Sequence, residues 1–188
     1  MRFFGARRAT RSSAPSVSEG GEPDRLRADV QNVLLAGPVG DAVGAVPAPV
    51  SNERISAWLD QSGFTYFVDT DGDLGGLWHG RLFYFLPLGP DGEVLQVRGQ
   101  WHREATIERL SDVLEVCNEW NAERIWPKTY ARVRDDGAIV VCAEVTVSVE
   151  HGANDDQLAQ HLQCGLSTSA MFFEHLDAVF ADPLGSAP

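Results

Sequence analysis

The chain has 188 residues, of which 44% are hydrophobic, and a formal net charge of −12. This length suits one domain with a substantial core and is too short for two domains of ordinary size. Residues 51–188 carry nine Lys and Arg against 22 Asp and Glu, a net charge of −13. Binding to a phosphate backbone requires clustered cations, so the composition argues against nucleic acid as a partner. The acidity either keeps the protein soluble or offers a face to a basic partner.

The first 50 residues differ in composition from the rest. Residues 1–23 combine Ser, Gly, Pro and Arg without apolar periodicity, which predicts a disordered tail. Phe3 and Phe4 lie near several arginines and could touch an anionic membrane surface, although a solvated tail is the simpler interpretation. Residues 24–50 predict a short amphipathic helix over 24–35, followed by a Gly/Pro linker.

The same composition bears on targeting. The basic N-terminal stretch has no hydrophobic region of the kind a secretory signal needs, and no run of about 18 apolar residues occurs anywhere. We therefore expect a cytoplasmic protein without a membrane span. Residues 184–188 are expected to form a second disordered tail, which leaves 51–183 as the folded domain.

Apolar periodicity predicts eight elements in the folded domain, in the order α-β-β-β-α-β-β-α. The predicted ranges are a helix over 52–62, strands over 64–69, 77–86 and 93–101, a helix over 106–122, strands over 129–134 and 138–149, and a helix over 155–180. Short turns between successive strands favour antiparallel pairing. The predicted fold class is therefore α+β, an antiparallel five-stranded sheet with helices packed on it.

Helix ends and one glycine carry local signals. Ser51 is placed to cap the first helix, and Asn154 with Gln157 has the spacing of a capping box at the start of the last helix. Gly165 lies in the middle of that last helix, where it costs about 1 kcal/mol relative to Ala. Its presence there indicates a close approach of another backbone.

The junction between the helix over 106–122 and the next strand is the most distinctive stretch. Pro127 prevents the helix from continuing, and Asn121 is expected to satisfy the last free helix carbonyls. Val116 and Trp120 lie off the centre of the apolar stripe of this helix. Their position indicates a second contact, for which another subunit is one candidate.

Metal-binding patterns are incomplete. The spacing of Asp69, Asp71 and Asp73 resembles the beginning of a calcium-binding loop. Such a loop needs a glycine where this sequence has Leu74 and a bidentate Glu where it has Gly80. A plain hairpin turn is therefore expected. Among the five histidines, only His161 has a helical partner, Cys164, at a spacing of three residues, and nothing completes four ligands.

Catalytic signatures are missing as well. The sequence contains no G-x-S-x-G, P-loop or dinucleotide fingerprint, although dispersed triad residues would leave no motif. Cys117, Cys142 and Cys164 lie in apolar segments without CxxC spacing, which favours reduced core thiols over a redox role. We therefore expect no enzymatic activity, no catalytic residue, no metal and no cofactor.

Aromatic and arginine side chains are the usual anchors of protein interfaces. Each such residue can equally fill the core with its polar atoms satisfied. The candidate partner-binding residues are Trp78, Arg81, Arg98, Trp101, Val116, Trp120 and Trp126.

Four short patterns resemble the YbjN family of bacterial sensory transduction regulators, over about residues 52–182. The patterns are Asp71-Gly72-Asp73-Leu74, Gln96-x-Arg98-Gly99-x-Trp101, Asn118-x-Trp120-Asn121 and Pro127-Lys128-x-Tyr130. The resemblance implies a fold similar to type III secretion chaperones. Since secretion chaperones of this shape bind client segments as dimers, it also implies a homodimer with a protein client or regulatory partner.

Two functional hypotheses follow from different classes. The first is a non-enzymatic, chaperone-like or regulatory protein-binding module, cytoplasmic and homodimeric. The second is a small-molecule sensor or an unrecognised enzyme that uses a pocket between sheet and helices. The second rests on Arg81, Arg98 and the histidines alone.

Overall fold

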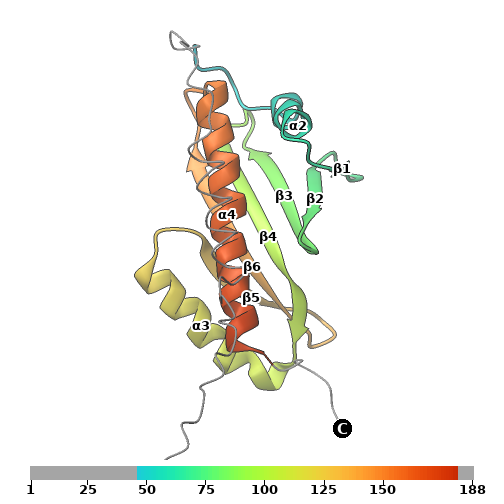
Figure 1. Cartoon of the computed structure of the whole chain (residues 1–188), viewed down its shortest axis with the longest axis vertical. Coiled ribbons are helices and arrows are strands. Elements are labelled where there is room, and N and C mark those ends of the chain that lie inside the picture. Colours follow the sequence, from blue (N-terminus) through green and yellow to red (C-terminus); the bar gives the residue numbers. More distant parts are fainter. Residues whose placement is uncertain (1–45, 182–188) are drawn as a thin grey trace, which may run out of the picture. The chain divides into compact units, whose positions relative to one another are not determined.

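The structure is a computed structural model that describes residues 46–181 (Figure 1). Its elements are α2 (Asn52–Gln61), β1 (Phe67–Val68), β2 (Leu74–Trp78), β3 (Arg81–Leu88), β4 (Val94–Ala105), the 3-10 helix η1 (Ile107–Arg109), α3 (Leu110–Glu123), β5 (Lys128–Val133), β6 (Ile139–Ser148) and α4 (Asp155–Val179). The predicted helix over 24–35 and the tails over 1–23 and 184–188 lie outside the described residues.

The strands form one sheet in the order β1-β2-β3-β4-β6-β5, and every neighbouring pair is antiparallel. From β4 the chain passes through η1 and α3 to the edge strand β5 and then returns by a tight turn to β6, which pairs with β4. The predicted α+β class with an antiparallel sheet is confirmed. The predicted number of five strands is wrong, because the sheet in the described part of the chain has six.

The extra strand comes from a hairpin inside the predicted strand over 77–86. His79 and Gly80 have φ angles of 51° and 75°, as in a two-residue type I′ turn, and Trp78 pairs with Arg81 across it. The turn reverses the alternation, so Trp78 lies on the same side of the sheet as Phe83 and Phe85, with ring centroids 5.8 and 5.4 Å away. The sequence prediction continued one strand through the His79-Gly80 dipeptide, which was the local signal for the turn.

Other strand and helix boundaries also differ from the predicted ones. The predicted strand over 64–69 keeps only Phe67–Val68, because Phe64 packs between Trp58 and Trp78 at centroid distances of 5.6 and 5.7 Å. At the other side of the sheet, β4 continues to Ala105, past an irregularity in its pairing with β6. The helix predicted from 106 begins as η1 before α3.

The core lies between one face of the sheet and the three α-helices of the described residues. It contains all of the buried apolar side chains of α2, α3 and α4, and the alternating residues of the strands that face them. Figure 1 shows α4 running along the sheet over β4 and β6. A Cβ atom built on Gly165 would lie 2.4 Å from the Cβ of Val97, so the predicted close backbone approach is confirmed and its partner is β4.

Both predicted helix caps are present. Ser51 Oγ accepts a hydrogen bond from the backbone N–H of Arg54 at 3.4 Å. At the start of α4, the N–H of Gln157 donates to Asn154 Oδ1 at 2.8 Å and the N–H of Asn154 donates to Gln157 Oε1 at 2.9 Å. This reciprocal pair is the capping box, and it satisfies two N–H groups that the helix itself leaves free.

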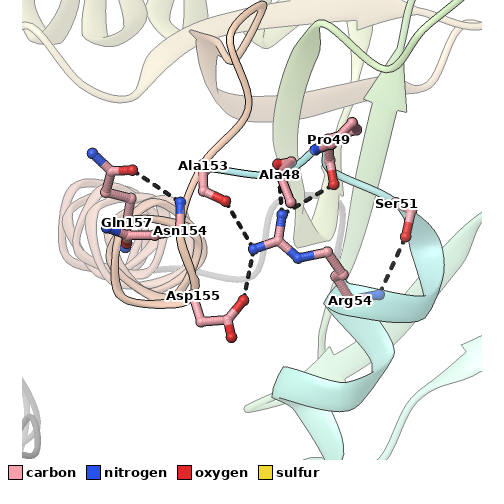
Figure 2. Close-up of polar contacts among 8 residues, drawn as sticks. All are labelled: Ala48, Pro49, Ser51, Arg54, Ala153, Asn154, Asp155 and Gln157. Carbon is pink, nitrogen blue, oxygen red and sulfur yellow. Dashed lines mark hydrogen bonds and ion pairs between the residues drawn. The ribbon is translucent and has the colours of Figure 1, made fainter. Parts of the chain in front are cut away.

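Arg54 joins the beginning of α2 to the beginning of α4 (Figure 2). Its guanidinium donates to the carbonyl oxygens of Ala48 at 2.7 Å, Pro49 at 3.0 Å and Ala153 at 2.9 Å. It also pairs with Asp155 at 2.6 Å. Ala48 and Ala153 exchange backbone hydrogen bonds, so residues immediately before α2 belong to the folded unit rather than to the predicted linker.

Asn121 acts differently from the prediction. Its side chain donates to the carbonyl of Thr129 at 2.8 Å and accepts from the N–H of Thr129 at 2.9 Å, so it binds the next strand as a backbone pair would. The helix carbonyls are instead met by Lys128, whose Nζ donates to the carbonyls of Asn121 at 3.3 Å and Arg124 at 3.2 Å. A lysine is a favourable partner there because the end of a helix carries partial negative charge.

Candidate interaction surface

The sheet has a second face that points away from the helices. Side chains alternate along a strand, so each residue beside a core residue points to this other side. Buried side chains such as Leu86, Val140 and Cys142 lie here and are not part of the main core cluster. We call this side of β3, β4, β6 and β5 the outer face. Among the described residues, no helix contributes a buried side chain to it.

Strand register arranges the outer face in rows. One row crosses β3, β4, β6 and β5 and is formed by Tyr84, Arg98, Glu144 and Lys128. The neighbouring row is formed by Leu82, Gln100, Cys142 and Tyr130. Arg98 and Glu144 therefore occupy the middle of the first row, which ends in Lys128, whose amine binds carbonyls at the end of α3. Apolar or aromatic residues occupy both ends of the second row.

Arg98 and Glu144 form the polar centre of the outer face. Arg98 Nε lies 3.7 Å from Glu144 Oε2, and the side chains are 37% and 26% exposed. Tyr130 Oη donates to the same carboxylate oxygen at 3.1 Å, while the Arg98 guanidinium also donates to Gln96 Oε1. Arg98 Nε is buried and has no hydrogen-bond acceptor in the described structure. The centre therefore holds an ion pair that is still short of one acceptor.

Two titratable groups of this region, Tyr130 and Cys142, have raised pKa values. Burial, with the nearby Cys142 thiol and Glu144 carboxylate, raises the pKa of Tyr130 to about 12. Burial also raises the pKa of Cys142. Both groups stay protonated near pH 7, and a thiol reacts as its thiolate, so neither Tyr130 nor Cys142 is an activated nucleophile at that pH.

The structure separates the seven predicted partner-binding residues. Of these, Arg98 alone lies on the outer face, and Trp126 is 37% exposed between α3 and β5. The remaining five are buried or partly buried on the helix side of the sheet: Trp78, Arg81, Trp101, Val116 and Trp120. Partner contact for each residue stays a prediction. The sequence analysis did not include Glu144 among the candidate partner-binding residues, although a single acidic residue within an apolar strand was a signal for it.

Arg81 and Trp101 meet at a carboxylate that no sequence pattern connects to them. Arg81 Nη2 donates to Asp177 Oδ2 at 2.7 Å, and Trp101 Nε1 donates to Asp177 Oδ1 at 2.8 Å. Arg81 and Trp101 are only 7% and 1% exposed. A buried cation and a buried indole N–H both need acceptors, so this contact secures the end of α4 to the sheet.

Trp120 makes its second contact within the chain. Its ring lies 5.1 Å from that of Phe172 and 5.5 Å from that of His175, both in α4, with the Arg124 guanidinium 4.0 Å from its centroid. Val116 is also buried, on the same helix. Trp120 of α3 is thus packed on α4, and Val116 belongs to the core.

The aspartate-rich segment forms the turn between β1 and β2, as predicted. Asp69 Oδ1 accepts from the N–H groups of Asp71 and Asp73 at 2.9 and 3.0 Å, so this carboxylate is engaged by the turn itself. Over residues 46–181, no group of three or more His, Cys, Asp or Glu is arranged to hold a metal ion. The same residues contain no helix long and apolar enough to cross a membrane.

The structure defines an α+β protein with helices on one face of an antiparallel sheet and a partly exposed polar centre, Arg98 and Glu144, on the other. Residues 51–178 match the YbjN family model, described as "Putative bacterial sensory transduction regulator". This match covers more than half of the chain, so the chain belongs to the YbjN family, and the predicted resemblance is confirmed.

One solved structure agrees at the level of the fold, and a second is reported for comparison. The crystal structure of YbjN from E. coli, described as a putative transcription regulator, aligns with a TM-score of 0.60 and 15% identity, covering 70% of this chain and 96% of that chain. An uncharacterized protein from Methanothermobacter thermautotrophicus aligns with a TM-score of 0.46 and 13% identity, covering 70% and 99%. A search of curated protein sequences found no match.

Proposed function

We propose that this chain is a non-enzymatic, cytoplasmic regulator that acts by binding protein, in a chaperone-like way, through the outer face of its sheet. The observation that carries the proposal is the position of Arg98 and Glu144. They stand, partly exposed, at the centre of a face that no described helix covers, with Tyr84, Tyr130 and Leu82 nearby. Family membership supports a regulatory role.

Physical chemistry favours binding over catalysis at this face. Arginine and tyrosine are enriched among residues that dominate binding energy, and Arg98 and Tyr130 both lie on this face. The titratable groups beside it are held protonated, as described above. The resemblance to secretion chaperones, which act as dimers on protein clients, adds self-association to the proposal.

Capture on an immobilised chain tests the proposal. Wild-type protein should retain a specific protein from the lysate of the source organism, and Arg98→Glu should lose it while keeping its far-ultraviolet circular dichroism and melting temperature. Arg109→Glu is the matched control, because Arg109 is similarly exposed at 45% but lies beside α3. Equal capture by wild type and Arg98→Glu would reject the outer face as the binding surface.

A further inference from the structure

Arg132 on β5 differs from the other basic residues of the domain. Residues 51–188 hold nine Lys and Arg. Eight of them contact a carboxylate or a backbone carbonyl: Arg54, Arg81, Arg98, Arg103, Arg109, Arg124, Lys128 and Arg134. Arg132 is exposed and makes no such contact within residues 46–181. In the described part of this acidic chain, its charge alone is not already used.

Arg132 lies on the outer face, one level along from Tyr130. It pairs with Val140 of β6, and Val140 pairs with Glu104 of β4. Burial raises the pKa of Cys142, and the positive charge of Arg132 opposes that rise, so the guanidinium lies near the buried thiol. Val140 and Cys142 are only 6% and 2% exposed. A free guanidinium is therefore held beside an apolar floor.

We infer that the outer face accepts an acidic amphipathic helix of a partner protein, and that Arg132 binds a carboxylate of that helix. The inference rests on the proposed protein-binding role and adds the chemistry of the partner. A guanidinium can bind a carboxylate through two parallel N–H···O bonds, a stronger and more specific contact than a neutral hydrogen bond. The partner segment thus has the opposite charge to the one that the net charge of the domain would select.

Local charge on the outer face explains this difference. The register of β3, β4, β6 and β5 places three cations on the face, Arg98, Lys128 and Arg132, and two acids, Glu104 and Glu144. Three against two gives a net charge of +1 there, whereas residues 51–188 together carry −13. At physiological ionic strength, charges more than about 8 Å away are largely screened. An incoming carboxylate therefore responds mainly to the nearby guanidinium.

The opposite end of the same side of the sheet is apolar. Leu77 of β2 pairs with Leu82 of β3, and Leu77 is 66% exposed. Four strand spacings of about 4.8 Å separate β2 from β5, so this leucine end lies about 19 Å from the strand that carries Arg132. A helix of about 13 residues spans that distance at 1.5 Å per residue. One such helix can reach both ends of the face.

A helix suits this surface better than an extended segment. The N–H and C=O groups of β3, β4 and β6 pair with neighbouring strands on both sides, so an extended segment laid on the face would find no backbone partner. A helix satisfies its own backbone groups and binds through one side-chain face. The inferred partner helix therefore has apolar residues at one end of that face and acidic residues at the other.

Fluorescence anisotropy with two labelled peptides tests the inference on the full chain. Both are helices of about 13 residues with leucines at one end, and the other end carries glutamates in one peptide and glutamines in the second. Wild type should bind the glutamate peptide more tightly. Arg132→Gln should weaken that binding about tenfold and leave the glutamine peptide unaffected, while Arg132→Lys should keep part of the difference. The control Arg109→Gln, beside α3, should change neither affinity.

The apolar end has its own variant. Leu77→Ser should weaken both peptides by a similar factor, because leucines occur in both. Unchanged affinities in Leu77→Ser would refute the placement of the helix. Circular dichroism and the melting temperature confirm that each variant is folded.

Four results would overturn the assignment of an acidic partner to Arg132. They are no binding of the glutamate peptide, equal binding of both peptides, an equal loss for both in Arg132→Gln, and tighter binding of a lysine peptide of the same pattern. The proposed function is judged separately by capture from the lysate. Capture that depends on Arg98 but not on Arg132 would reject the inference and leave the proposed function standing.

Discussion

Gly165→Ala tests the packing of α4 on the sheet, because two opposing effects meet at this residue. Alanine favours the helix by about 1 kcal/mol relative to glycine. Its Cβ, however, would lie 2.4 Å from Val97 Cβ and 2.7 and 2.8 Å from the two Val97 methyl carbons. The Cβ of Val97 is fixed by the strand backbone and cannot rotate away, so α4 or β4 must shift. Overpacking of this kind costs about 1–3 kcal/mol, and the upper end applies here.

The expected net effect is a loss of about 2 kcal/mol in the free energy of unfolding. For a chain of this size, that loss lowers the melting temperature by about 4–8 °C. Urea unfolding followed by tryptophan fluorescence measures it directly. Ser167→Ala is the matched control on the same helix, with an expected change within about 0.5 kcal/mol. Stability of Gly165→Ala at or above that of wild type would show that helix and strand are not in close contact.

Three further predictions concern polar contacts. Asp177→Asn leaves the buried charge of Arg81 unpaired and should lower the free energy of unfolding by about 2 kcal/mol in urea titrations; an unchanged midpoint would contradict this. Arg54→Met keeps the aliphatic stem but loses three hydrogen bonds to carbonyls and should cost about 1–2 kcal/mol by the same measurement, whereas wild-type stability would mean that these bonds contribute nothing. The folded-state pKa of Tyr130 is raised from 10.0 to about 12. The contribution of Tyr130 to the free energy of unfolding is therefore complete below pH 10 and is lost as the pH rises through 12. Tyr130→Phe should therefore lose less stability than wild type between pH 10 and 12. Equal slopes of the free energy of unfolding against pH in the two proteins would refute the raised pKa of Tyr130.

The sequence predicted features that depend on neighbours in the chain. The caps at Ser51 and Asn154, the turn at Asp69 and the interruption at Gly165 are local signals, and the structure confirms each of them. The hairpin at His79 was not predicted, because the aromatic and aliphatic residues on both sides of His79-Gly80 were assigned to one strand although the glycine was a local turn signal.

Long-range partners could not be predicted in this way. Arg81 and Trp101 were candidates for a partner surface because both types anchor interfaces, yet both donate to Asp177, 96 and 76 residues away in the sequence. Only the sheet register shows that Arg98 and Glu144 share a row. A single sequence does not contain that register, since it depends on which strands pair.

Capture of protein from the lysate of the source organism by immobilised wild type, Arg98→Glu and Arg109→Glu tests most directly the claim that the outer face binds protein. We predict that wild type and Arg109→Glu retain the same specific protein and that folded Arg98→Glu does not. Equal capture by wild type and Arg98→Glu would contradict the claim.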